Sequence, residues 1–295
     1  MTFRMTFEAE AAPCIWCFEK LGSYVYTGTG PQGKVIRSYD LSTWTDFAET
    51  GDAHVRSLKA WANALFMGTE PNGQIHVYNF TSGSFYKIVQ TEDHAVTCFT
   101  EHDGKLYAGT SPRGVIYVFD GILWQKSFKP GGGGVNSMVS SGGVLYAFLD
   151  NTEMPVRFVG GTWSAVADSD PQSVTFSSFA SSGNRFTTDG YGEVDLTQVE
   201  DVKSAVEVGE LSEADTPFMS PSLPETSLGS SAVDSVEGII VGGKLHGSVF
   251  SYQSPVLSKI FQSDAGGITA IANIGSSRNL VAAGDTLYLV AGEGE

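Results

Sequence analysis

Positive charge is scarce in this sequence. Only 17 of the 295 residues are lysine or arginine, against 33 aspartate and glutamate residues, and the formal net charge is −16. Binding to nucleic acid of any sequence depends on clustered lysine and arginine, so nucleic acid is not expected as a partner. An anionic membrane surface is disfavoured for the same reason.

Long apolar runs are also missing. No stretch of 18 consecutive apolar residues occurs, and the N-terminal segment 1–8 lacks the apolar core of a signal peptide. We therefore expect synthesis in a cytoplasm and no membrane insertion.

Cysteine is limited to Cys14, Cys17 and Cys98. The first two form a C-x-x-C pair, a spacing found in redox and zinc sites. Aligning the repeat described below puts Cys17 and Cys98 at the same position as Ser57 and Ser137. This position favours a small side chain in a crowded inner strand, where cysteine acts as a small hydrophobic residue. No metal site and no cofactor are expected.

The chain is built on a repeat of about 40 residues. Three segments share an aromatic residue, a Gly-Thr or similar pair, a Pro-x-Gly turn and an alternating apolar run: 26–40, 66–79 and 107–120. Their glycines Gly28, Gly68 and Gly109 are 40 and 41 residues apart. Four short strands of this total length are typical of one blade of a β-propeller.

Each unit has the same predicted order. An inner strand leads to a second strand that ends in Gly-Thr, and a third strand follows a turn such as 70–73. Pro71 and Gly73 suit a type I turn closed by a glycine with positive φ. A fourth strand begins near an aromatic residue, namely Trp44, Phe85 or Trp124. The fold class is therefore all-β.

Counting units gives seven blades, with six as the alternative because segment 197–238 has no clear register. The last blade has only three strands, and the alternating segment 2–8 is expected to supply the fourth and close the ring. The whole chain, 1–295, forms a single domain. An acidic insertion rich in serine and proline interrupts it at about 212–231.

Two sets of polar residues recur between blades. His54 and His94 precede neighbouring inner strands, and repeat inheritance explains them better than a metal or base site. Asp40, Asn79 and Asp120 end third strands, where a residue that bonds its own backbone is favoured over a calcium ligand. No Ser/His/Asp constellation stands out, and the glycine run 131–134 is expected to be a connection without a phosphate-binding role.

Binding is expected on loops, as is usual for repeat scaffolds. The candidate binding residues are the variable turn tips and two apolar residues of the insertion: Gln32, Asn72, Arg113, Tyr191, His246, Phe218 and Met219.

The repeat L-Y-x-G-T-x-P-x-G, best preserved at 106–114, resembles kelch-like and sensor-type propeller repeats, including those of tailed-phage virion proteins. This resemblance implies an exposed interaction or structural module that is not an enzyme. The leading hypothesis is a virion component, such as a tail, fibre or decoration protein, whose partners are other protein chains. A cytoplasmic location is the alternative to the virion. The alternative functions are a lectin that binds cell-surface glycan and a propeller hydrolase or lyase.

Overall fold

The computed structural model describes most of the N-terminal half of the chain and shorter stretches of the rest. The described residues are 2–6, 14–131, 133–141, 143–150, 156–165, 180–182, 185–188, 192–195, 232–235, 238–242, 248–253, 256–265, 267–275 and 278–291. The chain packs into two compact units: Trp16–Asp168, and Met1–Ile15 with Ser169–Glu295. In the described residues all regular elements are strands, and none of these residues forms a helix able to span a membrane.

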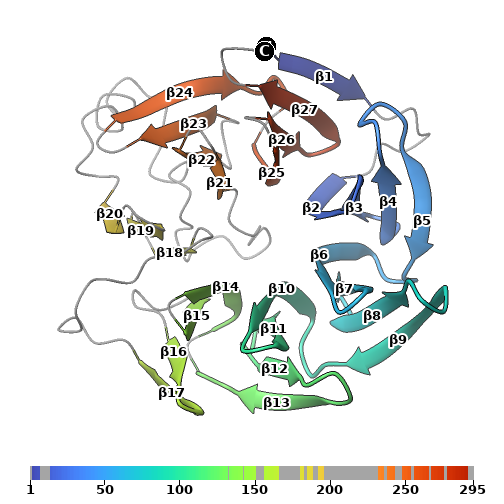
Figure 1. Ribbon diagram of the computed structural model, residues 1–295, viewed down its shortest axis with the longest axis vertical. Coiled ribbons are helices and arrows are strands. Elements are labelled where there is room, and N and C mark those ends of the chain that lie inside the picture. Colours follow the sequence, from blue (N-terminus) through green and yellow to red (C-terminus); the bar gives the residue numbers. More distant parts are fainter. Residues whose placement is uncertain are drawn as a thin grey trace. The chain divides into compact units, whose positions relative to one another are not determined.

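The unit of residues 16–168 holds four antiparallel sheets of four strands, each in simple chain order (Figure 1). The first contains β2 (Cys14–Leu21), β3 (Tyr24–Gly30), β4 (Lys34–Ser38) and β5 (Thr45–Glu49). The second contains β6 (His54–Trp61), β7 (Ala64–Glu70), β8 (Gln74–Asn79) and β9 (Ser84–Gln90). The third contains β10 (Ala95–His102), β11 (Lys105–Ser111), β12 (Ile116–Phe119) and β13 (Trp124–Phe128). The fourth contains β14 (Val135–Ser141), β15 (Val144–Leu149), β16 (Val156–Val159) and β17 (Thr162–Ala165).

In the other unit, the described residues form three sheets. One has three strands, β18 (Ala180–Ser182), β19 (Arg185–Thr188) and β20 (Gly192–Asp195). The next has four, β21 (Ala232–Ser235), β22 (Gly238–Gly242), β23 (Ser248–Gln253) and β24 (Val256–Gln262). The third joins β25 (Ala270–Gly275), β26 (Arg278–Ala283) and β27 (Thr286–Ala291) to β1 (Thr2–Thr6).

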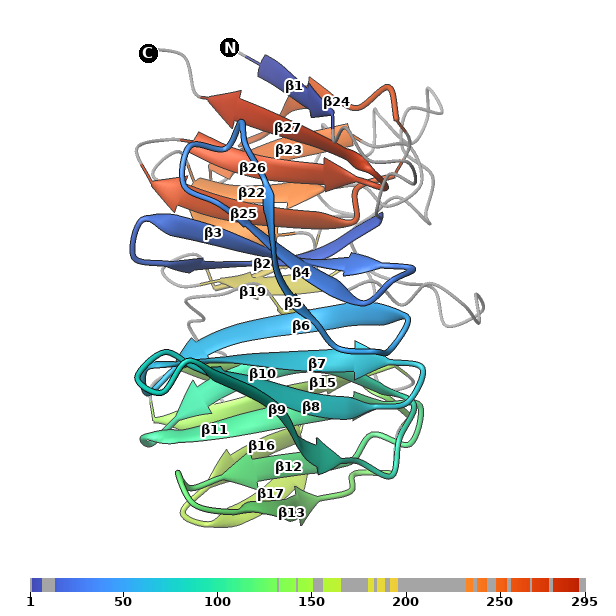
Figure 2. The same ribbon diagram turned by 90° about the vertical axis from the view of Figure 1, so that its right-hand side faces the viewer.

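Strand β1 pairs antiparallel with β27, from Thr2 opposite Val290 to Thr6 opposite Thr286 (Figure 2). The N-terminal strand thus completes a sheet whose other three strands come from the C-terminal end of the chain. The predicted all-β class and the four-strand unit are confirmed. The predicted insertion at about 212–231 lies outside the described residues.

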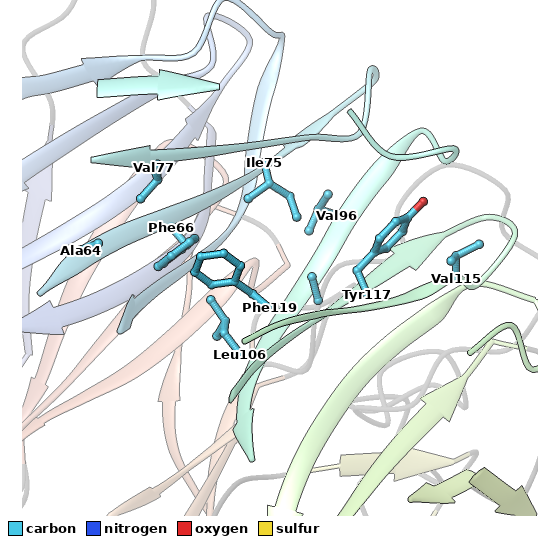
Figure 3. Packing of buried hydrophobic residues seen from close by; sticks show 10 residues of the cluster. Ala64, Phe66, Ile75, Val77, Val96, Leu106, Val115, Tyr117 and Phe119 are labelled. Carbon is cyan, nitrogen blue, oxygen red and sulfur yellow. The ribbon is translucent and has the colours of Figure 1, made fainter. Parts of the chain in front are cut away.

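The core lies between consecutive sheets. Successive side chains of a strand point to opposite faces, and second strands such as β7 and β11 are buried on both, so each sheet packs against its neighbours. Figure 3 shows the contact between the second and third sheets, where Phe66 of β7 meets Leu106 and Phe119 of the next sheet. Phe119 also stacks on Trp124 with centroids 5.2 Å apart, so the aromatic residue that starts a fourth strand seals the edge of the core.

The repeat turns contain the left-handed glycines that the sequence predicts. Gly33, Gly73 and Gly114 have φ values of 58°, 58° and 72°. The peptide bond before the proline of each turn is cis, at Gly30-Pro31, Glu70-Pro71 and Ser111-Pro112.

A Thr-x-Asp motif before each of two inner strands fastens these turns. The Thr91 hydroxyl donates to the Gly73 carbonyl of the preceding sheet at 2.7 Å. The buried Asp93 carboxylate accepts from the Thr110 hydroxyl at 2.7 Å and from the Arg113 amide at 3.0 Å, both in its own sheet. Thr50 and Asp52 make the equivalent bonds one repeat earlier. The motif therefore ties each turn to the next sheet.

We predict that Asp93→Ala lowers the free energy of unfolding by about 2–4 kcal/mol, because a buried hydroxyl and amide lose a charged acceptor. Urea denaturation measures this change. Glu92→Ala is the matched control, since the Glu92 side chain makes an exposed ion pair with Lys126 and its removal should leave the free energy of unfolding nearly unchanged. Equal effects of the two substitutions would contradict the role of the Asp93 bonds.

His76 on β8 is a buried histidine outside the turns. Its ring stacks on Phe85 at 5.5 Å, and its Nε2 lies 3.0 Å from Oε1 of Gln74. Burial holds the pKa of His76 below its ordinary value, because it disfavours the charged imidazolium.

The unfolded chain therefore takes up a proton at His76 at higher pH than the folded chain does. The stability that the neutral ring supports is complete above about pH 6.5 and declines as the pH falls below that value. We expect the loss of stability between pH 7.5 and 5.5 to be smaller in His76→Leu than in the natural chain. Equal pH dependence in the two proteins would contradict this.

Candidate functional site

The strands β2, β6 and β10 begin at the end of their sheets that also carries the Pro-x-Gly turns. His54, the first residue of β6, lies opposite Glu70, the last residue of β7 before its turn. Residues at the start of an inner strand therefore lie beside the turn tips, and we call this the turn end of unit 16–168.

The predicted tip residues Gln32, Asn72 and Arg113 are all exposed at the turn end, each on the turn of a different sheet. The Asn72 side chain donates to Oδ1 of Asp52 at 3.0 Å, so it is occupied in fastening its own turn. The other four predicted binding residues lie outside the described residues: Tyr191, His246, Phe218 and Met219.

The turn end carries a cluster that joins the first two sheets. The indole Nε1–H of Trp16 donates to Nδ1 of His54 at 3.1 Å, and the rings meet edge to face with centroids 5.3 Å apart. A Cβ added to Gly30 would lie 1.9 Å from Nδ1 of His54 and 2.8 Å from Nε1 of Trp16. Glycine at position 30 is therefore required for the two rings to meet.

This hydrogen bond decides the tautomer of His54. Indole nitrogen is a donor only, so Nδ1 of His54 must supply the lone pair. The proton of the neutral ring then resides on Nε2. Within the described part of the chain, no protein group bonds to Nε2, so the half-buried ring presents an N–H donor at the turn end.

An ion pair lies beside the Trp16 ring. The Arg56 guanidinium lies over the Trp16 ring, 4.4 Å from its centroid, and bonds to the Glu70 carboxylate at 3.2 Å. His54, Arg56 and Glu70 therefore combine a donor, a fixed cation and a carboxylate within one patch. We call these three residues with Trp16 and Gly30 the Trp16–His54 cluster.

His54 and His94 lie near the same place in the repeat but are offset by one residue. His54 is the first residue of β6 and pairs with Glu70, whereas the equivalent residue of the next sheet is Ala95, which pairs with Ser111. His94 precedes Ala95 and is exposed. The sequence signal for the cluster is therefore the third residue of the inner strand, which is tryptophan in β2, arginine in β6 and threonine in β10.

The residues that end the third strands are turn residues, as predicted. Oδ1 of Asp40 accepts from the amides of Ser42 and Thr43 at 2.9 and 2.8 Å. Asn79 and Asp120 make the same pair of bonds. The backbone amide of Thr43 above all lowers the pKa of Asp40 to about 2. Among the described residues, no three His, Cys, Asp or Glu side chains gather as metal ligands would.

The cysteine position behaves as the repeat predicts. The Cys17 thiol points to the Val55 carbonyl of the next sheet at 3.6 Å, and the Ser57 hydroxyl donates to the Val96 carbonyl at 2.8 Å. Burial raises the pKa of the Cys17 and Cys98 thiols to about 12, where they are poor nucleophiles.

We predict that Cys17 and Cys98 resist Ellman's reagent at pH 8 in the folded protein. At a pKa of about 12, about one thiol in ten thousand is ionised at that pH, against about a quarter for an unperturbed cysteine. The assay uses Cys14→Ser, so that only these two thiols are counted. Both should react after unfolding in urea. Fast reaction of either thiol in the folded protein would contradict their burial.

Comparisons with known proteins support the propeller fold. No family of known sequences and no individually characterised protein matches the chain by sequence. A catalytically inactive variant of virginiamycin B lyase from Staphylococcus aureus, solved with quinupristin, is similar over 98% of both chains, with a TM-score of 0.72 and 12% identity. A streptogramin B lyase gives a TM-score of 0.70 at 10% identity, over 98% of this chain and 96% of the other. A chain of the mitotic checkpoint complex gives 0.60 at 15%, over 99% and 93%.

These similarities correct one prediction from the sequence. We expected the chain not to be an enzyme, because it contains no familiar catalytic motif. The first two proteins named are structures of lyases with the same fold over nearly the same length, so the missing motif and the fold do not justify that expectation. None of the three structures named here is described as a virion protein.

Proposed function

We propose that the chain is a β-propeller enzyme and that the Trp16–His54 cluster is its acid–base site. The observation that carries this proposal is the bond from Trp16 to Nδ1 of His54, which fixes the imidazole in one tautomer. A histidine with only a packing role would need neither the Trp16 indole as a donor nor a glycine at position 30 that leaves room for both rings.

The three polar groups have separate roles. The Nε2–H of His54 donates to an oxygen of the substrate as negative charge develops there. The Arg56 side chain, only 8% exposed, packs on Trp16 and orients the Glu70 carboxylate through their ion pair. The Glu70 carboxylate accepts a proton from the substrate. The bond to the leaving oxygen then breaks as a carbon–carbon double bond forms, and the leaving oxygen takes the proton back from the Glu70 carboxyl group. Proton removal followed by protonation of a leaving oxygen is the chemistry of an elimination, and we therefore favour a lyase over a hydrolase.

The proposal is tested by incubating the purified chain with virginiamycin B and with quinupristin. Elimination conserves the total mass of substrate in its products, whereas hydrolysis adds one water, so mass spectrometry distinguishes the two reactions. We expect elimination products. If neither compound is altered and neither shifts the NMR signals of His54, these compounds are not substrates and the proposal fails in this form.

We predict that His54→Ala lowers the rate by about 10²–10⁴-fold, because a positioned acid or base contributes that much to a proton transfer. His94→Ala is the matched control, since it removes an exposed histidine just before the next inner strand, and it should stay within about twofold. Trp16→Phe keeps the aromatic ring but removes the N–H donor, so its rate should fall while the fold persists. Equal rates for His54→Ala and His94→Ala would exclude His54 from the reaction.

We also propose that the seven sheets are seven blades of one closed ring, with β1 as the outer strand of the last blade. The five residue pairs between β1 and β27 support this arrangement. Gln32 and Arg113 would then border the substrate entrance at the turn end.

Deletion of residues 1–9 should lower the melting temperature markedly or cause aggregation, because it exposes the edge of β27. Calorimetry and light scattering measure both effects. Replacing the alternating apolar residues Phe3 and Met5 with serine retains the backbone pairing and should cost less. A deleted chain that melts like the full chain would refute closure by β1.

A further inference from the structure

A second polar cluster lies at the opposite end of unit 16–168, where β10 and β14 end. His102, the last residue of β10, is only 3% exposed, yet its contacts include polar groups. The equivalent positions in the first and second sheets hold Leu21 and Trp61, which pack against the hydrophobic core. His102 is thus a departure from the repeat at a place where an apolar side chain suffices.

Both nitrogens of His102 face polar groups. Nδ1 lies 2.8 Å from Oγ of Ser140 on β14, and Nε2 lies 3.4 Å from Oδ2 of Asp103. The rings of Tyr107 and Phe158 meet the imidazole edge to face at 6.0 and 6.1 Å and fix its plane. With the Nε2 proton toward the Asp103 carboxylate, Nδ1 holds the lone pair and the Ser140 hydroxyl donates to it.

The sequence alone does not reveal this Ser/His/Asp set, because the three residues do not form a continuous motif. Ser140 and His102 are 38 residues apart, on adjacent inner strands, and meet only when the sheets pack. A carboxylate, an imidazole and a hydroxyl in this order form the relay of a serine nucleophile, which is recognised by geometry and not by sequence position. Ser140 is half-buried, whereas His102 behind it is only 3% exposed.

We propose that Ser140 is a nucleophile activated by His102 and oriented by Asp103, and that it accepts acyl groups from small activated carboxylic esters. Oγ of Ser140 bonds to the ester carbonyl carbon while its proton passes to Nδ1 of His102. The bond from that carbon to the leaving oxygen breaks, and the leaving oxygen takes the proton from Nδ1. Water then attacks the acyl-serine, gives its proton to Nδ1, and releases a carboxylic acid as Ser140 recovers its proton.

This site is separate from the Trp16–His54 cluster and does not depend on it. The probes are a fluorophosphonate, which labels activated serines, and p-nitrophenyl acetate. We expect peptide mass spectrometry to place the phosphonate adduct on Ser140, and p-nitrophenol release to fall at least 100-fold in Ser140→Ala. Ser127→Ala is the matched control, because Ser127 is also half-buried but bonds to the Trp163 indole and to no histidine.

His102→Leu tests the relay without emptying the core, since Leu21 occupies the equivalent position. Its circular dichroism and melting curve should show a folded protein, and its labelling rate at Ser140 should fall at least tenfold. His94→Leu, which replaces an exposed histidine outside this cluster, should leave labelling at Ser140 unchanged. No adduct on Ser140, or equal labelling in folded His102→Leu, would overturn the proposal.

Discussion

The structure of unit 16–168 depends on how closely each sheet approaches the inner strand of the next. A Cβ on Gly28 would lie 2.6 Å from the Val55 carbonyl oxygen and 2.5 Å from the Cys17 thiol. Gly68 meets Ser57 and the next inner strand in the same way. Any side chain at these glycines would force the sheets apart, so the spacing of the repeat glycines sets the spacing of the sheets.

The Trp16–His54 cluster uses the same close approach. Gly30, two residues beyond Gly28, leaves room for the indole of one sheet to reach the imidazole of the next. The contact therefore requires no dedicated loop and arises where the third residue of an inner strand is a tryptophan. Because that residue varies between repeats, a uniform scaffold presents a different side chain at each junction.

The sequence predicts those features that depend on local geometry. The strands, the left-handed glycines, the turn role of Asp40 and the small residue at Cys17 all follow from alternation, spacing or backbone preference. The Thr-x-Asp fastening and the bond from Trp16 to His54 do not, because their partners are about 20 to 40 residues apart and meet only when strands or sheets pack. The expectation that the chain is not an enzyme was not justified by a missing motif, since the same fold occurs in lyases and catalytic groups need not form a continuous motif.

Nitrogen-15 NMR of the histidine rings tests the central claim most directly, because it reports the protonation of each nitrogen. At neutral pH, His54 should show an unprotonated Nδ1 and a protonated Nε2, and Trp16→Phe should remove the preference for this tautomer. Coupling from the Trp16 indole proton to Nδ1 of His54 would identify the donor. A protonated Nδ1, or a tautomer mixture that Trp16→Phe leaves unchanged, would contradict the proposed acid–base site.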